Sequence, residues 1–158
     1  MTLLDRIRSS DQEGWRRFVI LYTPLIAYWC RRQGVSREDA DDVTQEVLRA
    51  VASGIGDFRQ GPQGSSFRGW LRSVTHHKAI DWRRYQSRQP AGAVGGTEAG
   101  LMLQGLPEGG DGGEDDPEQL SGLFRRALDL VRGEFEAKTW RAFWSVVVEG
   151  RETADVAR

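Results

Sequence analysis

Cationic and aromatic side chains alternate through residues 67–88, and these are the residue types that bind nucleic acids. Six residues of this segment are Arg or Lys, two are His and one is a carboxylate. Arg68, Arg72 and Arg83 are spaced to lie on one side of a helix. A cationic side beside exposed flat rings can hold a phosphate backbone and stack unpaired bases. A solvated basic helix with core aromatic residues has the same pattern, so both interpretations stay open here.

A polar stripe lies on the segment before it. Asp42, Gln45, Glu46 and Arg49 occur at i, i+3, i+4 and i+7, with Asp41 at the edge. Carboxylates near the start of a helix are stabilised by the positive end of the helix dipole. Gln45 and Glu46 lie too far from the start of the helix for the dipole to explain them. The stripe is therefore either an ordinary solvated face or an acidic docking surface for a basic partner helix. The apolar residues of the same segment are Ala40, Val43, Val47, Ala50 and Val51.

Three helices are expected to position these residues. The first begins after Asp11, which can cap it, and ends at Gly34, while Pro24 predicts a kink or a restart inside it. Ser36 and Asp39 have the spacing of a capping box and open the second helix. A glycine-containing loop follows, and the basic segment is the third helix, capped by one of two serines, Ser65 or Ser66.

The remaining chain has a different composition. Residues 89–115 contain nine glycines, two prolines and five carboxylates but no Lys or Arg, which predicts a flexible linker. Helical periodicity returns at Pro117, with breaks at Gly133 and Gly150, and no useful β-alternation occurs. We expect an all-α protein with a helical domain, a disordered acidic linker and an incomplete helical C-terminal domain, at residues 1–88, 89–116 and 117–158.

The charge and the single cysteine restrict the class of protein. Residues 1–90 contain 15 basic and 10 acidic residues (+5), and residues 91–158 contain 7 and 13 (−6), which sum to the net −1. Local charge governs contact with a polyanion, so the near-neutral total allows nucleic-acid binding. Cys30 is expected in the core, fits a reducing cytoplasm and cannot form an internal disulfide. Without a recognisable signal peptide or spanning segment, a soluble cytoplasmic protein is expected.

Catalytic patterns are missing from the sequence. The adjacent His76 and His77 would point about 100° apart on a helix and cannot share a metal. One cysteine provides no zinc-site spacing, and no phosphate-binding glycine loop or nucleophile elbow occurs. We therefore expect a protein that is not an enzyme and that needs no metal or cofactor.

Two stretches together resemble the sigma-70 family of bacterial RNA polymerase sigma factors, in particular its extracytoplasmic-function group. They are D-A-D-D-V-T-Q-E-V-L-R-A-V and F-R-G-W-L-R-S-V-T-H-H-K-A-I-D-W-R-R, joined by a glycine-containing loop. The resemblance covers residues 10–88, the family's region 2, and more weakly residues 117–158, the start of region 4. It implies a sigma factor that recognises and opens promoters, with core RNA polymerase, promoter DNA and an anti-sigma factor as candidate partners.

The resemblance also implies roles for individual residues. Residues from Gly54 to Phe67 match a loop that captures a flipped base. Trp82 and Tyr85 are ambiguous, since each can either contact a base or pack within the protein. The residues that match the dock on the polymerase clamp coiled coil are Asp41, Asp42, Gln45 and Glu46. Those that match the promoter-contacting helix are Arg68, Arg72, Lys78, Arg83, Arg84 and Arg88, and those that pack this helix in place are Phe67, Trp70 and Leu71.

Two positions depart from the family pattern. His77 stands where the family commonly has Asn, and the last residues, E-T-A-D-V-A-R, supply only the opening of a helix-turn-helix. A fragment of a longer sigma factor is expected, because a broad apolar face that needs a partner is formed by Trp140, Phe143, Trp144 and Val147. A helical protein-binding adaptor and a general nucleic-acid-binding module that acts without polymerase remain the alternatives.

Overall fold

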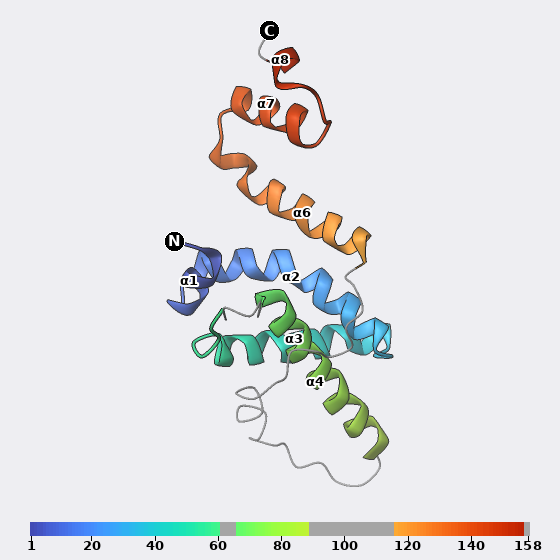
Figure 1. Cartoon of the computed structure of the whole chain (residues 1–158). Coiled ribbons are helices and arrows are strands. Elements are labelled where there is room, and N and C mark those ends of the chain that lie inside the picture. The colour runs from blue at the N-terminus through green and yellow to red at the C-terminus, as the bar shows by residue number, and fades with distance from the viewer. Residues whose placement is uncertain (61–65, 89–115, 157–158) are drawn as a thin grey trace. The chain divides into compact units, whose positions relative to one another are not determined.

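The computed structural model describes residues 1–60, 66–88 and 116–156, which form helices and turns and contain no strand (Figure 1). The predicted all-α class is confirmed. The chain divides into two compact units, Met1–Asp116 and Pro117–Arg158, which are described separately below. The expected linker lies outside the described residues, apart from Asp116.

Two helices begin the first unit. Helix α1 (Leu3–Arg8) starts at Thr2, whose hydroxyl accepts a hydrogen bond from the Asp5 N–H at 3.2 Å. The periodicity did not predict α1, because six residues are too few to show a helical repeat. Helix α2 (Gln12–Arg32) runs through Pro24 as one element, so the predicted restart does not occur. The predicted cap at Asp11 is confirmed, since its carboxylate accepts the Gly14 N–H at 2.9 Å.

Helices α3 (Arg37–Gly54) and α4 (Phe67–Arg88) complete the unit. The Ser36 hydroxyl accepts the Asp39 N–H at 3.2 Å and donates to the Asp39 carboxylate at 2.7 Å. The predicted cap at Ser36 is therefore confirmed. The capping box is incomplete, because the Asp39 carboxylate accepts from the Ser36 hydroxyl and not from the Ser36 backbone N–H. At α4 the Ser66 hydroxyl accepts the Gly69 N–H at 3.0 Å, and Ser65 lies outside the described residues.

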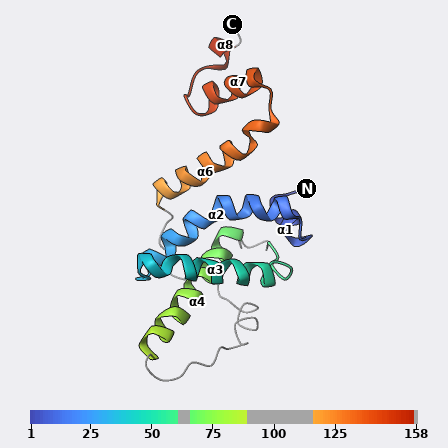
Figure 2. The same cartoon turned by 180° about the vertical axis from the view of Figure 1, so that it is seen from behind.

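The core lies where α2, α3 and α4 meet. Figures 1 and 2 show α2 and α3 side by side, with the first half of α4 packed against both. Burying each large apolar side chain contributes about 1.5–3 kcal/mol, so this core carries most of the unit's stability. The largest fully buried apolar side chains are Phe18, Leu25 and Ile26 of α2, Val47 and Val51 of α3, and Leu71 and Val74 of α4.

An aromatic cluster fixes the start of α4. The ring of Phe67 lies 5.9 Å from Phe18 and 5.6 Å from Tyr22 of α2, measured between ring centroids. Phe58, which follows α3, lies 5.7 Å from Phe67 and 5.2 Å from Trp70. Phe67 and Leu71 are buried in the core, as expected, whereas Trp70 is half-buried and contributes its ring to this cluster.

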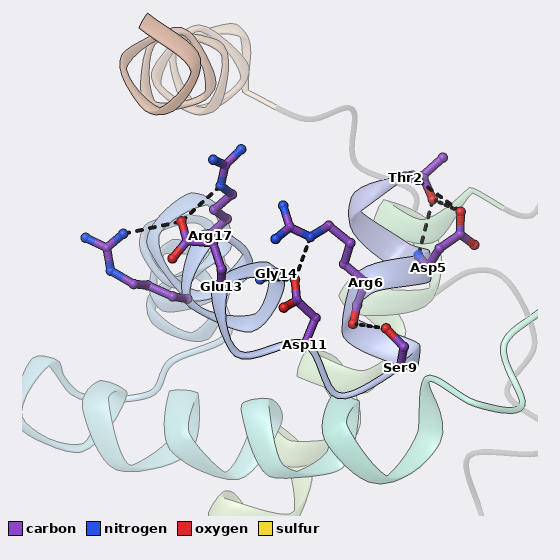
Figure 3. Close-up of polar contacts among 9 residues, drawn as sticks. Thr2, Asp5, Arg6, Ser9, Asp11, Glu13, Gly14 and Arg17 are labelled. Carbon is purple, nitrogen blue, oxygen red and sulfur yellow. Dashed lines mark hydrogen bonds and ion pairs between the residues drawn. The ribbon is translucent and has the colours of Figure 1, made fainter. Parts of the chain in front are cut away.

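A close approach joins α1 to α2, as Figure 3 shows. The Arg6 Nε lies 2.5 Å from the carboxylate of Asp11, the same group that caps α2. A Cβ atom added at Gly14 would lie 2.6 Å from the Cβ of Arg6. Only glycine therefore lets the two helices approach this closely.

The second unit contains α6 (Pro117–Val131), a 3-10 turn η2 (Arg132–Glu134), α7 (Ala137–Val147) and the short α8 (Thr153–Val156). The ring of Trp140 lies 5.6 Å from Phe143 and 6.1 Å from Trp144, so the expected apolar face is present on α7. Phe143 is 37% exposed. Among the described residues of both units, no helix is long and apolar enough to cross a membrane.

Candidate polymerase and nucleic-acid interfaces

The acidic stripe predicted on α3 forms one exposed surface. At 100° per residue, Asp41, Asp42, Gln45 and Glu46 fall within about 140° of the helix circumference. The opposite side of the helix, with Val43 and Val47, is buried in the core. The structure thus brings together on one exposed side the residues expected to dock on polymerase, Asp41, Asp42, Gln45 and Glu46.

The charges of this stripe are unevenly compensated. Arg49 forms an ion pair with Glu46, one turn away on the same surface. Within the described residues, Asp41 and Asp42 form no ion pair. Two carboxylates therefore remain to attract a cationic partner surface, and they do so most strongly at low ionic strength.

The predicted DNA-contacting residues fall into two groups along α4. Arg68, Arg72 and Lys78 are partly buried near the core, and the Arg72 guanidinium lies over the ring of Trp29, 5.7 Å from its centroid. The three remaining residues lie in the second half of α4, which extends beyond α2 and α3 in both views (Figures 1 and 2). They are Arg83, Arg84 and Arg88, and all are exposed.

These cationic residues do not share one side of the helix. Helix geometry places Arg68, Arg72 and Arg83 within about 60° of one another, as the spacing predicts. Arg84 and Arg88 lie about 160° to 200° from Arg68, on nearly the opposite side. The second half of α4 is thus cationic on two sides.

The two histidines connect α4 to different groups. The His76 ring N–H donates to the side-chain oxygen of Gln33, at the end of α2, over 2.7 Å between heavy atoms. His77 donates to the backbone carbonyl of Ser73 at 2.8 Å, and the two rings are nearly perpendicular. Among the described residues, no three His, Cys, Asp or Glu side chains form a group that could hold a metal. His76 is on the same side of α4 as Arg72, a placement that the sequence analysis did not identify.

The connection between α3 and α4 is held in place where it leaves α3. Phe58 is buried, with 6% of its surface exposed, and its backbone carbonyl accepts a hydrogen bond from Arg8 at 2.7 Å. Arg59 also donates to this carbonyl, at 3.0 Å. Residues 61–65, in the middle of the predicted base-capturing loop, lie outside the described residues. Sequence analysis missed Arg8, since no spacing rule relates positions 50 residues apart.

The two ambiguous aromatic residues of α4 differ in exposure. Tyr85 is 49% exposed, which leaves much of its ring accessible to a flat partner. Trp82 is partly buried. Of the two, Tyr85 is better placed to contact a base.

Comparison with known families assigns the first unit. Residues 18–89 match the family described as Sigma-70 region 2, a stretch that begins within α2 and includes the acidic stripe and all of α4. No curated protein and no solved structure matches the chain. Region 2 of sigma factors binds core RNA polymerase and promoter DNA. Residues 18–89 are therefore similar to sigma-70 region 2, and this similarity supports a sigma-70 family sigma factor with a role in RNA polymerase binding and promoter melting.

Proposed function

We propose that this protein is a sigma factor of the extracytoplasmic-function group, which directs core RNA polymerase to promoters and opens the strands there. The observation that carries the proposal is the division of charge in the first unit. An exposed acidic stripe lies on α3 and an extended cationic surface lies on α4. Because the apolar sides of both helices enter one core, the two surfaces are held at a constant separation.

The acidic stripe is the proposed polymerase dock. Asp41 and Asp42 attract a cationic surface, and Gln45 adds a hydrogen-bonding group between them and Glu46. The clamp coiled coil of polymerase is the proposed partner, since a helix pair can pack along a helical stripe. Exposed charges of this kind increase the rate of association and select the partner more than they increase affinity.

The cationic surface of α4 is the proposed promoter contact. Arg83, Arg84 and Arg88 are exposed and can reach phosphates, whereas Arg68, Arg72 and Lys78 are partly buried nearer the core. Phosphate contacts release counterions, which favours binding of a single strand as well as a duplex. The exposed ring of Tyr85 can stack on an unpaired base, and the loop from Gly54 to Phe67 is the proposed site of a flipped base.

The proposal extends to the rest of the chain. Residues 1–88 form the region 2-like domain, residues 89–116 a linker, and residues 117–158 part of a region 4-like domain. The protein acts in the cytoplasm, makes and breaks no covalent bond, and needs no cofactor. An anti-sigma factor is a further proposed partner, which would cover one of the two charged surfaces by the same charge complementarity.

The test is transcription with bacterial core RNA polymerase and the full chain on a library of randomised duplex DNA. Sequencing of the transcripts should reveal start sites with a shared upstream element that disappear when the chain is omitted. Binding to core polymerase without transcription would indicate the adaptor, and DNA binding without polymerase binding would indicate the general nucleic-acid module. Either result contradicts the proposal.

A further inference from the structure

Helix α1 lies outside the residues that match the family, yet it is firmly attached to the region 2 unit. The Thr2 backbone N–H and hydroxyl both donate to the Asp5 carboxylate, at 3.0 and 2.8 Å. Arg6 pairs with Asp11, and Gly14 admits the close contact described above (Figure 3). The Thr2 contacts stabilise α1 itself, and the contacts of Arg6 with Asp11 and Gly14 hold α1, whose last residue is Arg8, against α2.

Arg8 points at the end of α3. Its Nη2 donates to the carbonyl of Phe58 at 2.7 Å, and its Nε donates to the carbonyl of Ile55 at 3.3 Å. Ile55 is the C-cap residue directly after α3, and the last turn of α3 has no basic residue of its own. A cation at a helix C-terminus interacts favourably with the unpaired carbonyls and with the negative end of the dipole. Arg8 therefore supplies from α1 the cap that α3 lacks.

Phe58 links the contact with Arg8 to the start of α4. Its carbonyl is held by Arg8, while its ring packs on Phe67 and Trp70 at the start of α4. The connection from α3 thus leaves the core in one orientation, set by a guanidinium on one side and by two aromatic rings on the other. Fixing such a segment before binding lowers the entropy lost when a ligand is held there.

We infer that Arg8 is a positioning residue for promoter opening, which it serves by holding the buried residues Ile55 and Phe58, at the start of the proposed base-capturing loop, in one orientation. This inference rests on the proposed function. Arg8 touches no DNA in this role; its guanidinium acts through the backbone of Ile55 and Phe58. The partly buried side chain also contacts Asp5 at 3.6 Å, so its charge is balanced locally and not by phosphate.

The test compares Arg8→Gln and Arg8→Lys in the full chain with the control Arg16→Gln. Arg16 is exposed and pairs with Glu13 of its own helix, so the control removes an equal charge from a side chain whose ion pair lies within α2. The first measurement is hydrogen exchange at the Asp57 and Phe58 N–H groups, both of which bond the Gly54 carbonyl. Exchange should be about tenfold faster in Arg8→Gln, intermediate in Arg8→Lys and unchanged in the control.

The second measurement separates positioning from general stability. Permanganate reactivity of unpaired thymines, on a promoter recovered from the randomised library, reports strand opening, and co-sedimentation reports binding to core polymerase. We expect about tenfold fewer open complexes for Arg8→Gln at unchanged polymerase binding, with partial recovery in Arg8→Lys. A merely structural role would lower polymerase binding and opening together.

The outcomes distinguish this inference from the proposed function. Unchanged exchange at Phe58, or wild-type opening by Arg8→Gln, overturns the role of Arg8 while leaving a sigma factor that works. Equal losses of polymerase binding and opening also overturn it. If the wild-type chain opens no promoter at all, the proposed function fails, and the role of Arg8 in opening fails with it.

Discussion

The ring of Phe58 meets the ring of Phe67 edge to face, with centroids 5.7 Å apart and planes at 76°. Phe58 follows the helix that carries the acidic stripe, and Phe67 begins the helix that carries the cationic surface. Such aromatic pairs contribute about 0.5–1.5 kcal/mol beyond the area they bury. The contact therefore helps to hold the helix with the acidic stripe and the helix with the cationic residues in one geometry.

Reversing the charge of the acidic stripe should weaken binding to core polymerase. In Asp42→Arg with Glu46→Arg, two carboxylates become cations that repel a basic partner, and we expect at least about tenfold weaker binding by titration. The matched control is Asp129→Arg with Glu152→Arg, an equal change of charge at exposed positions in the second unit. Full transcription by the stripe variant would show that α3 is not the dock.

The exposed arginines of α4 should determine the salt dependence of DNA binding. Each phosphate contact to a single strand contributes about 0.7 to the slope of log K against log salt concentration. Changing Arg83, Arg84 and Arg88 to Gln should therefore reduce the slope by about 2, as measured by fluorescence anisotropy with a labelled single strand. The control replaces Arg125, Arg132 and Arg141 by Gln in the second unit. An equal reduction in the control would mean that net charge, and not α4, binds the strand.

Gly14→Ala should destabilise the protein although alanine favours helix. Helix propensity alone predicts a gain of about 1 kcal/mol, whereas a Cβ that lies 2.6 Å from the Arg6 Cβ forces α1 away, at a cost of about 1–3 kcal/mol. We expect a net loss of about 1 kcal/mol in denaturant unfolding.

Gly56→Ala is the control for this change, since a Cβ there meets no atom within 4 Å. Its effect should stay within about 0.5 kcal/mol. A more stable Gly14→Ala protein would mean that α1 does not pack on α2 at this position.

Cys30 should resist thiol reagents while the protein is folded. Burial raises the pKa of its thiol from 9.0 to about 11, so at pH 8 only about one molecule in a thousand carries the reactive thiolate. Labelling with a disulfide reagent should be at least about 100-fold slower than in the unfolded chain. Rapid labelling under native conditions would place Cys30 outside the core.

The same pKa shift has a defined effect on stability. Below pH 9 the thiol is protonated in both the folded and the unfolded chain, so the contribution of Cys30 to stability is constant. Between about pH 9 and pH 11 the unfolded chain releases the proton first, and the free energy of unfolding falls as the pH rises. The opposite trend in this range, measured against a Cys30→Ala variant, would contradict the burial of the thiol.

Local features could be predicted from the sequence because each depends on one helix. The helical repeat that places Val43 and Val47 on the buried side of α3 places Asp42 and Glu46 on its exposed side. This holds whatever α3 packs against. The cap at Asp11 depends on atoms three residues away. The existence of the longer helices, their buried sides and the placement of the acidic stripe therefore followed from spacing alone, whereas the six residues of α1 were too few to predict.

The tertiary structure decided which of these parts touch. Arg8 meets the carbonyl of Phe58, and His76 meets Gln33, across separations of 50 and 43 residues. These contacts depend on where α1, α2 and α4 cross, and the crossing is set by how the core side chains of several helices fit together. The periodicity of the sequence does not predict how these side chains fit together. The sequence by itself therefore determined the two charged surfaces, and only the packing of the helices decided how they are held together.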